Sequence, residues 1–292
     1  MPTTETIPVT LDVGVHYDIP AHVYHADPCP IPSLSSGIAR TINAESLAEA
    51  YRRHVRFGGM KKPRTAAMDA GALVHSLIAE RPDDFEVGNY DNYQSNAAKA
   101  WRDNVIASGR NAALEKHLDN ARRIVASLKK NVCNGGITND PFAAHGKSEV
   151  TIIWKERDAY CRCLPDRMLI EPGAIDVWDW KITNDVTDRA ILRSVMKWGY
   201  HEQEALYRRG ISAAFPGHRI SWMFAFVLDC EPYTVRRVCL TPEFLAAGKR
   251  AVSSAIAAWQ QATKTNVWPD KSEETLHLDA PGYLLDDEIS AS

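Results

Sequence analysis

The sequence contains no apolar run of about 18 residues, which is the length that a membrane-spanning helix requires. Its first residues also lack the basic and apolar regions of a signal peptide. These two absences argue against a membrane protein and against a secreted one. We therefore expect a cytoplasmic protein.

Cysteines are few and no two of them form a C-x2-C pair, so the usual spacing of a zinc or iron–sulfur site is missing. On a strand, Cys161 and Cys163 would point to the same side, but no second pair of Cys or His residues lies near them in the sequence to complete a metal site. The complete Gly-rich phosphate loop of ATPases is also absent, which predicts no ATP site. We predict no iron–sulfur cluster and free, buried thiols for Cys29, Cys133, Cys161, Cys163, Cys230 and Cys239.

The charge balance is close to neutral, with a formal net charge of −3 at pH 7. This excludes a protein coated with basic residues for general binding to nucleic acid, although it leaves room for local basic patches. Short basic clusters do occur, for example Arg52-Arg53 and Arg236-Arg237. At 292 residues, of which 45% are hydrophobic and 24% charged, the chain can form one compact globular domain.

Helical signals dominate residues 1–135. Ser35-Ser36 predicts the start of a helix that continues to about Arg53. A helix rich in small side chains follows at 65–80, and residues 94–130 show apolar side chains at helical spacing. We interpret this portion as mostly helical and packed on the rest of the chain, after an irregular or strand-like lead-in at residues 1–33.

Strand signals dominate residues 136–270. Apolar runs with β character predict strands at 149–154, 160–164, 175–182, 220–228 and 233–240. Two helices are predicted among them, at 186–209 and, opened by Thr241 and Pro242, at 242–263. This order predicts an α/β fold with a mixed sheet flanked by helices. The acidic residues 271–292 are predicted to form a flexible tail.

The residues that could take part in catalysis or bind a metal gather around the third predicted strand. Asp166 follows a proline, and Asp179-Trp180-Lys181 begins thirteen positions later. A strand places Asp179 and Lys181 on the face of its apolar residues, where charge costs free energy unless it is paired. A divalent cation held by Asp166 and Asp179, with Lys181 beside a bound water, would supply that pairing. The alternative is an ordinary surface salt bridge.

Further segments extend this pattern along the chain. In order, they are residues 24–27, 33–36, 70–75, 161–166, 179–181, 203–207 and 267–269. Together they resemble the PD-(D/E)xK nuclease superfamily, and within it the RecE-like exonucleases (exonuclease VIII type) of phages and prophages, with motifs of RecB-like nucleases. The resemblance covers about residues 17–270 and implies a restriction-endonuclease-like core, because the ordered set is specific although no single segment is.

The resemblance also implies roles for single residues. His75 would be a metal ligand beside the two aspartates, and the alternative is a histidine satisfied in a helical core. Gln203 and Tyr207 lie four apart, hence on one helical face, where they would position DNA or the catalytic lysine. Glu149 would face the site through a water or a basic side chain, or else point to solvent.

The implied activity is exonucleolytic hydrolysis of linear duplex DNA, 5′→3′, with Mg²⁺ as the ion and Mn²⁺ as a substitute. The implied partners are double-stranded DNA, a single-strand annealing protein in phage-type recombination, and further copies of the chain in a ring. The setting would be the cytoplasm of a bacterial or phage-infected cell. Two alternatives stay open: an endonuclease or defence nuclease of the same fold, and a DNA-binding relative without catalysis.

Overall fold

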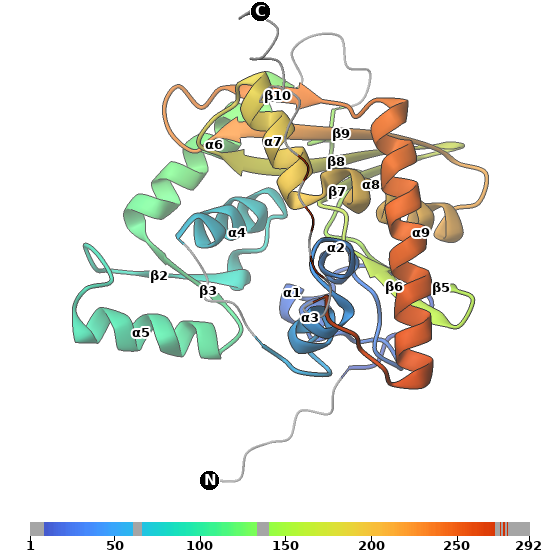
Figure 1. Cartoon of the computed structure of the whole chain (residues 1–292). Helices are drawn as coiled ribbons and strands as arrows, with labels where there is room; N and C mark the ends of the chain where they lie inside the picture. The colour runs from blue at the N-terminus through green and yellow to red at the C-terminus, as the bar shows by residue number, and fades with distance from the viewer. Residues whose placement is uncertain are drawn as a thin grey trace, which may run out of the picture.

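A five-stranded mixed sheet forms the centre of the molecule (Figure 1). The computed structural model describes residues 9–60, 66–132 and 140–271, together with 275, 277 and 279. β8 and β9 run parallel, and the other neighbours in this sheet are antiparallel. The predicted fold class is confirmed. The strands lie in the order β10 (Val235–Val238), β9 (Arg219–Leu228), β8 (Ala174–Thr183), β7 (Arg167–Glu171) and β4 (Lys147–Ser148).

Two smaller sheets lie beside the central one, an antiparallel sheet of three strands and a parallel pair. The strands expected at 149–154 and 160–164 are present, but they pair with each other and with β1 instead of joining the central sheet. The sequence pattern does not predict β7, β2 or β3, because strands of four or five residues carry little periodic signal. The strands are β1 (Gly14–His16), β5 (Thr151–Glu156) and β6 (Ala159–Cys163), and β2 (Phe85–Gly88) with β3 (Asn111–Leu114).

Helices cover the sheets on both sides (Figure 1). The helices expected at 35–53 and 186–209 are each divided in two, and a strand interrupts the one at 94–130. The helices are α1 (Ala21–His25), α2 (Ser36–Ala44), α3 (Leu47–Arg53), α4 (Ala66–Ile78), α5 (Asn96–Ala107), α6 (Glu115–Val132), α7 (Asp188–Trp198), α8 (Tyr200–Ala214) and α9 (Pro242–Thr265), with a 3-10 turn at Pro82–Asp84.

Local chemistry explains the two divisions. The Ser46 hydroxyl accepts a hydrogen bond from the backbone N–H of Glu49 at 3.1 Å, so a new cap starts α3 just after α2 ends. Gly199, between α7 and α8, has a φ of 63°, the left-handed conformation that glycine adopts without strain. The predicted helix starts at Ser35-Ser36 and Pro242 are confirmed.

The central strand β8 is buried on both faces. Ile175 and Val177 lie in a core with residues of α2, α8 and α9, whereas Trp178 and Trp180 lie in a second core with residues of α4 and α6. This alternation confirms the predicted division of the strand into two faces. It also fixes the direction of Asp179, which extends toward α8 from within a buried strand.

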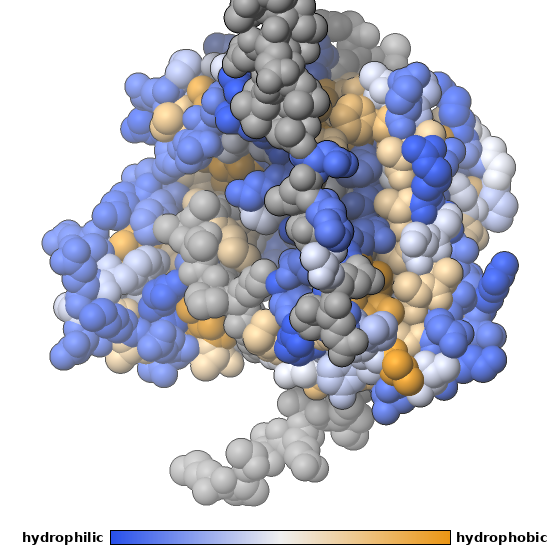
Figure 2. All heavy atoms as spheres, in the orientation of Figure 1, coloured by the Kyte–Doolittle hydropathy of each residue, from blue (hydrophilic) through white to orange (hydrophobic). Residues whose placement is uncertain are grey.

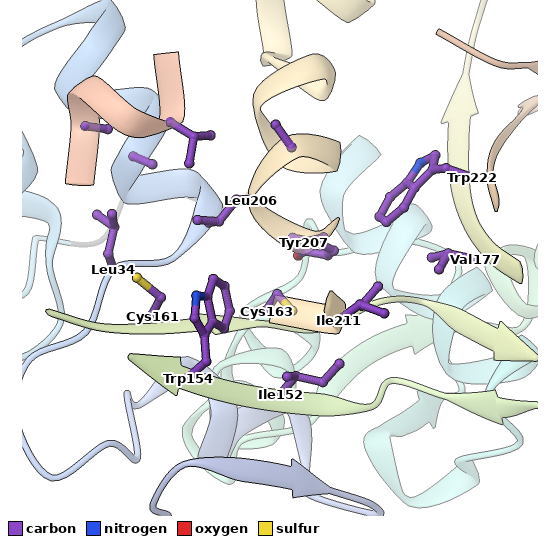
Figure 3. Packing of buried hydrophobic residues seen from close by; sticks show 14 of the residues in the cluster. Leu34, Ile152, Trp154, Cys161, Cys163, Val177, Leu206, Tyr207, Ile211 and Trp222 are labelled. Carbon is purple, nitrogen blue, oxygen red and sulfur yellow. The ribbon is translucent and has the colours of Figure 1, made fainter. Parts of the chain in front are cut away.

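The contact of α8 with β5 and β6 is close because of a glycine. A Cβ on Gly210 would lie 2.6 Å from the ring of Trp154, so a larger residue would push the helix away. Figure 3 shows Tyr207 and Ile211, on the same helix, turned into this core beside Cys163. The position of α8 over the sheet is thereby fixed, and α8 carries Gln203.

All described cysteines are free. Cys29, Cys161 and Cys163 are buried, as predicted. The prediction is wrong for Cys230 and Cys239, which are exposed because they follow the ends of β9 and β10 at the edge of the sheet. Cys133 lies outside the described residues.

The first part of the chain contributes to the sheets of the second part. β1 pairs with β5, and Leu34 forms a parallel bridge with Cys161.

Among the described helices none is both long and apolar enough to cross a membrane. Figure 2 shows hydrophilic side chains over most of the face seen in Figure 1, with apolar ones in small groups. Most of the predicted tail, 271–292, lies outside the described residues.

Candidate active site

Asp166 lies just before β7, where the pairing between β7 and β8 stops at Arg167 and Trp178. Beyond this pair, the backbone N–H of Trp180 donates to Oδ2 of Asp166 at 2.8 Å. The backbone carbonyl of Asp166 in turn accepts from the N–H of Glu149 at 3.1 Å. The hydrogen bond from Trp180, just beyond the end of the pairing between β7 and β8, therefore holds the Asp166 carboxylate against β8, the strand that carries Asp179.

His75 reaches the same carboxylate from α4. Its Nδ1 lies 3.5 Å from Oδ1 of Asp166. Burial alone would lower the pKa of His75, but the charge and hydrogen bond of Asp166 together with the charge of Asp179 outweigh it and the pKa is raised. Burial alone would raise the pKa of Asp166, and the charges of His75 and Lys181 reverse that and lower it. The structure thus brings together the histidine and the aspartate that the sequence separates by ninety-one positions.

Asp179 is almost completely buried, with 1% of its surface exposed. It forms an ion pair with Lys181 and accepts a hydrogen bond from Nε2 of Gln203 at 2.6 Å. Oε1 of Gln203 accepts from Nζ of Lys181 at 3.1 Å, which closes a three-residue ring of contacts. Burial, together with the negative charge of Asp166, raises the pKa of Asp179 to about 6 in spite of Lys181.

Lys181 also lies over an aromatic ring that the sequence pattern does not single out. Its Nζ is 4.2 Å from the ring centre of Tyr200, at the start of α8, and 5.7 Å from that of Phe224. The faces of these rings attract a cation. Burial alone would lower the pKa of Lys181, but the acidic groups around it, Asp179 first among them, together outweigh it and the pKa is raised. The ammonium is therefore held as a cation from several sides.

Glu149 meets a basic side chain, which is one of the two situations considered from the sequence. Nη1 of Arg81 lies 2.7 Å from Oε2 of Glu149 and 3.0 Å from the carbonyl oxygen of Ile19. Glu149 has a φ of 48°, so its backbone is in the left-handed region. Burial raises the pKa of its carboxyl, against the charge of Arg81. Nothing in the sequence near Arg81 marks it as this partner.

Gln203 and Tyr207 have different surroundings although they share a helical face. Gln203 touches both Asp179 and Lys181. Tyr207 is buried in the core one turn later and packs edge-on against Trp222, with 5.8 Å between the ring centres. Its geometry is that of a residue that fixes α8, while Gln203 contacts the charged groups.

No three His, Cys, Asp or Glu side chains in the described part of the chain converge into a ready group of metal ligands. His75 and Asp166 lie together, whereas the Asp179 carboxylate is turned to Lys181 and Gln203. This arrangement still suits Mg²⁺, which keeps several waters and needs only one or two protein carboxylates. The raised pKa of Asp179 beside a second carboxyl is also what a nearby cation would relieve.

Gly146-Lys147-Ser148 ends like a phosphate loop, but Pro141 stands where the first glycine of that loop is needed. Lys147 and Ser148 form strand β4 and do not open a helix. The segment is part of the central sheet.

The sequence matches the model of a protein family over residues 41–280, and that family is described as a "PDDEXK-like domain of unknown function (DUF3799)". The chain belongs to this family. A solved structure from Eubacterium rectale, named "Putative exonuclease", is similar with a TM-score of 0.59 and 15% identity. The match covers 91% of this chain and 95% of that one. An identity this low establishes the fold alone, and no curated protein matches the sequence.

Membership of the PDDEXK-like family confirms the superfamily that the sequence resembles. It supports a nuclease, and nucleases of this kind generally use divalent metal ions. The carboxylates of Asp166 and Asp179 and the amine of Lys181 stand where the name of the motif requires an acid, an acid and a lysine.

Proposed function

We propose that this protein is a metal-dependent deoxyribonuclease that degrades linear duplex DNA from an end. The observation that carries the proposal is the ring of contacts between Asp179, Lys181 and Gln203 beside the Asp166–His75 pair. Two carboxylates and an ammonium at the end of a buried strand cost free energy and contribute nothing to packing. Such an arrangement is typical of sites that hydrolyse phosphodiesters with a metal.

Asp166 and Asp179, with His75, would hold one or two Mg²⁺ ions. A bound divalent ion supplies a water of lowered pKa and neutralises charge on the phosphate. An ammonium has three N–H donors, and Lys181 directs one at Asp179 in their ion pair and gives one to Gln203 in a hydrogen bond. The third is left to orient the attacking water or contact the phosphate, and the cation stabilises the added negative charge.

The direction and the partners are proposed from the resemblance to RecE-like exonucleases. Digestion would run 5′→3′ and leave a 3′ single strand, on which an annealing protein of phage-type recombination would act. Several copies of the chain would enclose the DNA in a ring. The name of the Eubacterium rectale protein agrees with exonuclease action and says nothing of direction.

Cleavage of end-labelled linear duplex and of covalently closed circular DNA tests the proposal. We expect linear duplex to be degraded with Mg²⁺ or Mn²⁺ and closed circles to survive. Ca²⁺ should support binding without cleavage, since its larger radius and looser geometry do not align water and phosphate. Full activity in excess chelator would contradict the metal requirement. Cleavage of closed circles would favour an endonuclease. The absence of cleavage under all conditions would favour a DNA-binding protein without catalysis.

A further inference from the structure

Trp198, the last residue of α7, is 48% exposed although it stands next to the candidate active site. Two cations lie against its ring. The guanidinium of Arg40, on α2, is 5.4 Å from the ring centre, and Nζ of Lys197 is 4.9 Å from it. An indole is usually largely buried or covered by a partner. About half of Trp198 is open to solvent, so this part of its surface is free to contact a ligand.

The turn after Trp198 leads directly into the active site. Gly199 follows, and a Cβ on it would lie only 3.0 Å from Cδ of Arg40, so Arg40 packs against this turn. The next residue is Tyr200, whose ring lies under Nζ of Lys181. Figure 1 shows the end of α7 beside α2 in the middle of the molecule. The exposed indole is therefore two residues along the chain from Tyr200, the ring that contacts Lys181.

Two cations, Arg40 and Lys197, lie at this surface with one acid, because Oε1 of Glu202 would lie 3.3 Å from a Cβ on Gly199. Within the described residues, neither Arg40 nor Lys197 forms an ion pair. Asp188 pairs with Arg236 at 2.7 Å, and Glu202 accepts a hydrogen bond from the side chain of Asn43 at 2.6 Å, so the two cations still outnumber the single acid at this turn. An exposed aromatic ring with nearby cations suits a strand of nucleic acid, because bases stack on the ring and phosphates contact the cations. Here Lys197 precedes the ring in the chain, and Arg40 approaches it from α2.

We propose that Trp198 stacks on an unpaired base of the substrate strand next to the scissile phosphate, while Arg40 and Lys197 turn from the ring to the phosphates that flank this base. The inference rests on the proposed function, which supplies the DNA. A base offers its face to an indole only where it is unstacked from its neighbour, and a strand entering an exonuclease site is unstacked at its end. The surface thus holds the end of the strand in register with Asp166 and Lys181.

Binding of a labelled single-stranded oligonucleotide, measured by fluorescence anisotropy in Ca²⁺, tests this assignment without cleavage. Trp198→Ala should weaken binding about tenfold, within the range of one lost base–aromatic stack, and Trp198→Phe should retain most of the affinity. Met196→Ala is the matched control, since Met196 is 59% exposed on the same helix but has no place beside Arg40. Thermal unfolding of each variant checks that the fold is kept.

The salt dependence of binding separates the cations from the ring. Arg40→Ala and Lys197→Ala should each lower the slope of log affinity against log salt by about 0.7, the value for one phosphate contact on a single strand. Lys99→Ala, which removes an exposed charge on α5, a helix that packs on β2 and β3, should leave the slope unchanged. In Mg²⁺, Trp198→Ala should raise KM more than it lowers kcat.

Equal binding by Trp198→Ala and Met196→Ala, with wild-type protein still binding and cleaving DNA, would overturn this inference alone. Wild-type protein that neither binds nor cleaves DNA would overturn the proposed function together with it. A Trp198→Ala variant that loses a self-association shown by the wild type, at unchanged DNA affinity, would assign the indole to a second copy of the chain and also overturn the proposal.

Discussion

Two buried aspartates of this protein have opposite surroundings. Asp27, fully buried, accepts from the N–H and hydroxyl of Ser33 at 2.9 and 2.6 Å and pairs with Arg162 at 2.9 Å, with His54 at 3.3 Å. Burial alone would raise its pKa, but these donors outweigh it and the pKa is lowered. Asp179 is as deeply buried, but there burial, with the charge of Asp166 added, outweighs Lys181 and raises the pKa to about 6.

The difference separates a structural charge from a functional one. Asp27 has enough donors to remain ionised at no net cost, and it ties the lead-in to β6 through Arg162. Asp179 faces a second carboxyl nearby, and its ionised form is incompletely compensated until a further cation arrives. Stability and activity therefore depend on different aspartates. A substitution at Asp27 should mainly lower the stability of the fold, whereas one at Asp179 should mainly lower metal affinity and cleavage.

The largest expected effect is on stability at Asp27. Asp27→Asn removes the counter-charge of Arg162, a guanidinium with 5% of its surface exposed, and should lower the free energy of unfolding by about 3–5 kcal/mol. Urea unfolding measures it. Asp188→Asn is the control, because its pair with Arg236 lies at the surface and should contribute about 0–1 kcal/mol. A loss at Asp27 no larger than at Asp188 would contradict the structural role.

The next effect is on turnover at Lys181. Lys181→Ala removes a cation but no metal ligand, so metal should still bind while kcat falls about a hundredfold or more. Asp166→Asn and Asp179→Asn should instead lower metal affinity and cleavage together. Calorimetric titration with Mn²⁺ and steady-state cleavage distinguish the two classes. Near-normal turnover of Lys181→Ala would reduce the Asp-Trp-Lys motif to a structural ion pair.

A pH effect of intermediate size is expected from Asp179. Its pKa is 3.8 in an ordinary environment and about 6 in the folded protein. Between these values the folded state holds a proton that the unfolded chain has released, so stability falls as pH rises from about 4 to 6. Asp179→Asn should abolish this decline, worth about 3 kcal/mol, in unfolding experiments without divalent metal. Parallel pH profiles for the variant and the wild type would show that Asp179 titrates normally.

The smallest expected effect is at His75. If it binds metal, His75→Ala should raise the Mg²⁺ concentration for half-maximal cleavage about tenfold, in the range of losing one supporting group at a metal site. Its thermal stability should change little, because the imidazole packs beside Asp166 and not in either core. A lowered melting temperature with an unchanged metal requirement would identify a structural histidine.

The sequence by itself determined the parts of the fold that depend on local chemistry. Alternating residues in β8, the cap at Ser35 and the proline that opens α9 are read within a few positions of the chain. The sequence also marked Asp166, Asp179 and Lys181, because a motif with fixed spacing on one strand needs no knowledge of distant residues. It failed where a single serine or glycine divides a helix, as at Ser46 and Gly199.

Only the tertiary structure decided which distant groups meet these residues. Arg81 reaches Glu149, which is 68 positions away in the sequence. Tyr200 lies under Lys181 because α8 is held in place by the close contact of Gly210 with Trp154. The opposite pKa shifts of Asp27 and Asp179 arise in the same way. Both are aspartates in the sequence, and the donors and charges that fold around each one set its free energy of ionisation.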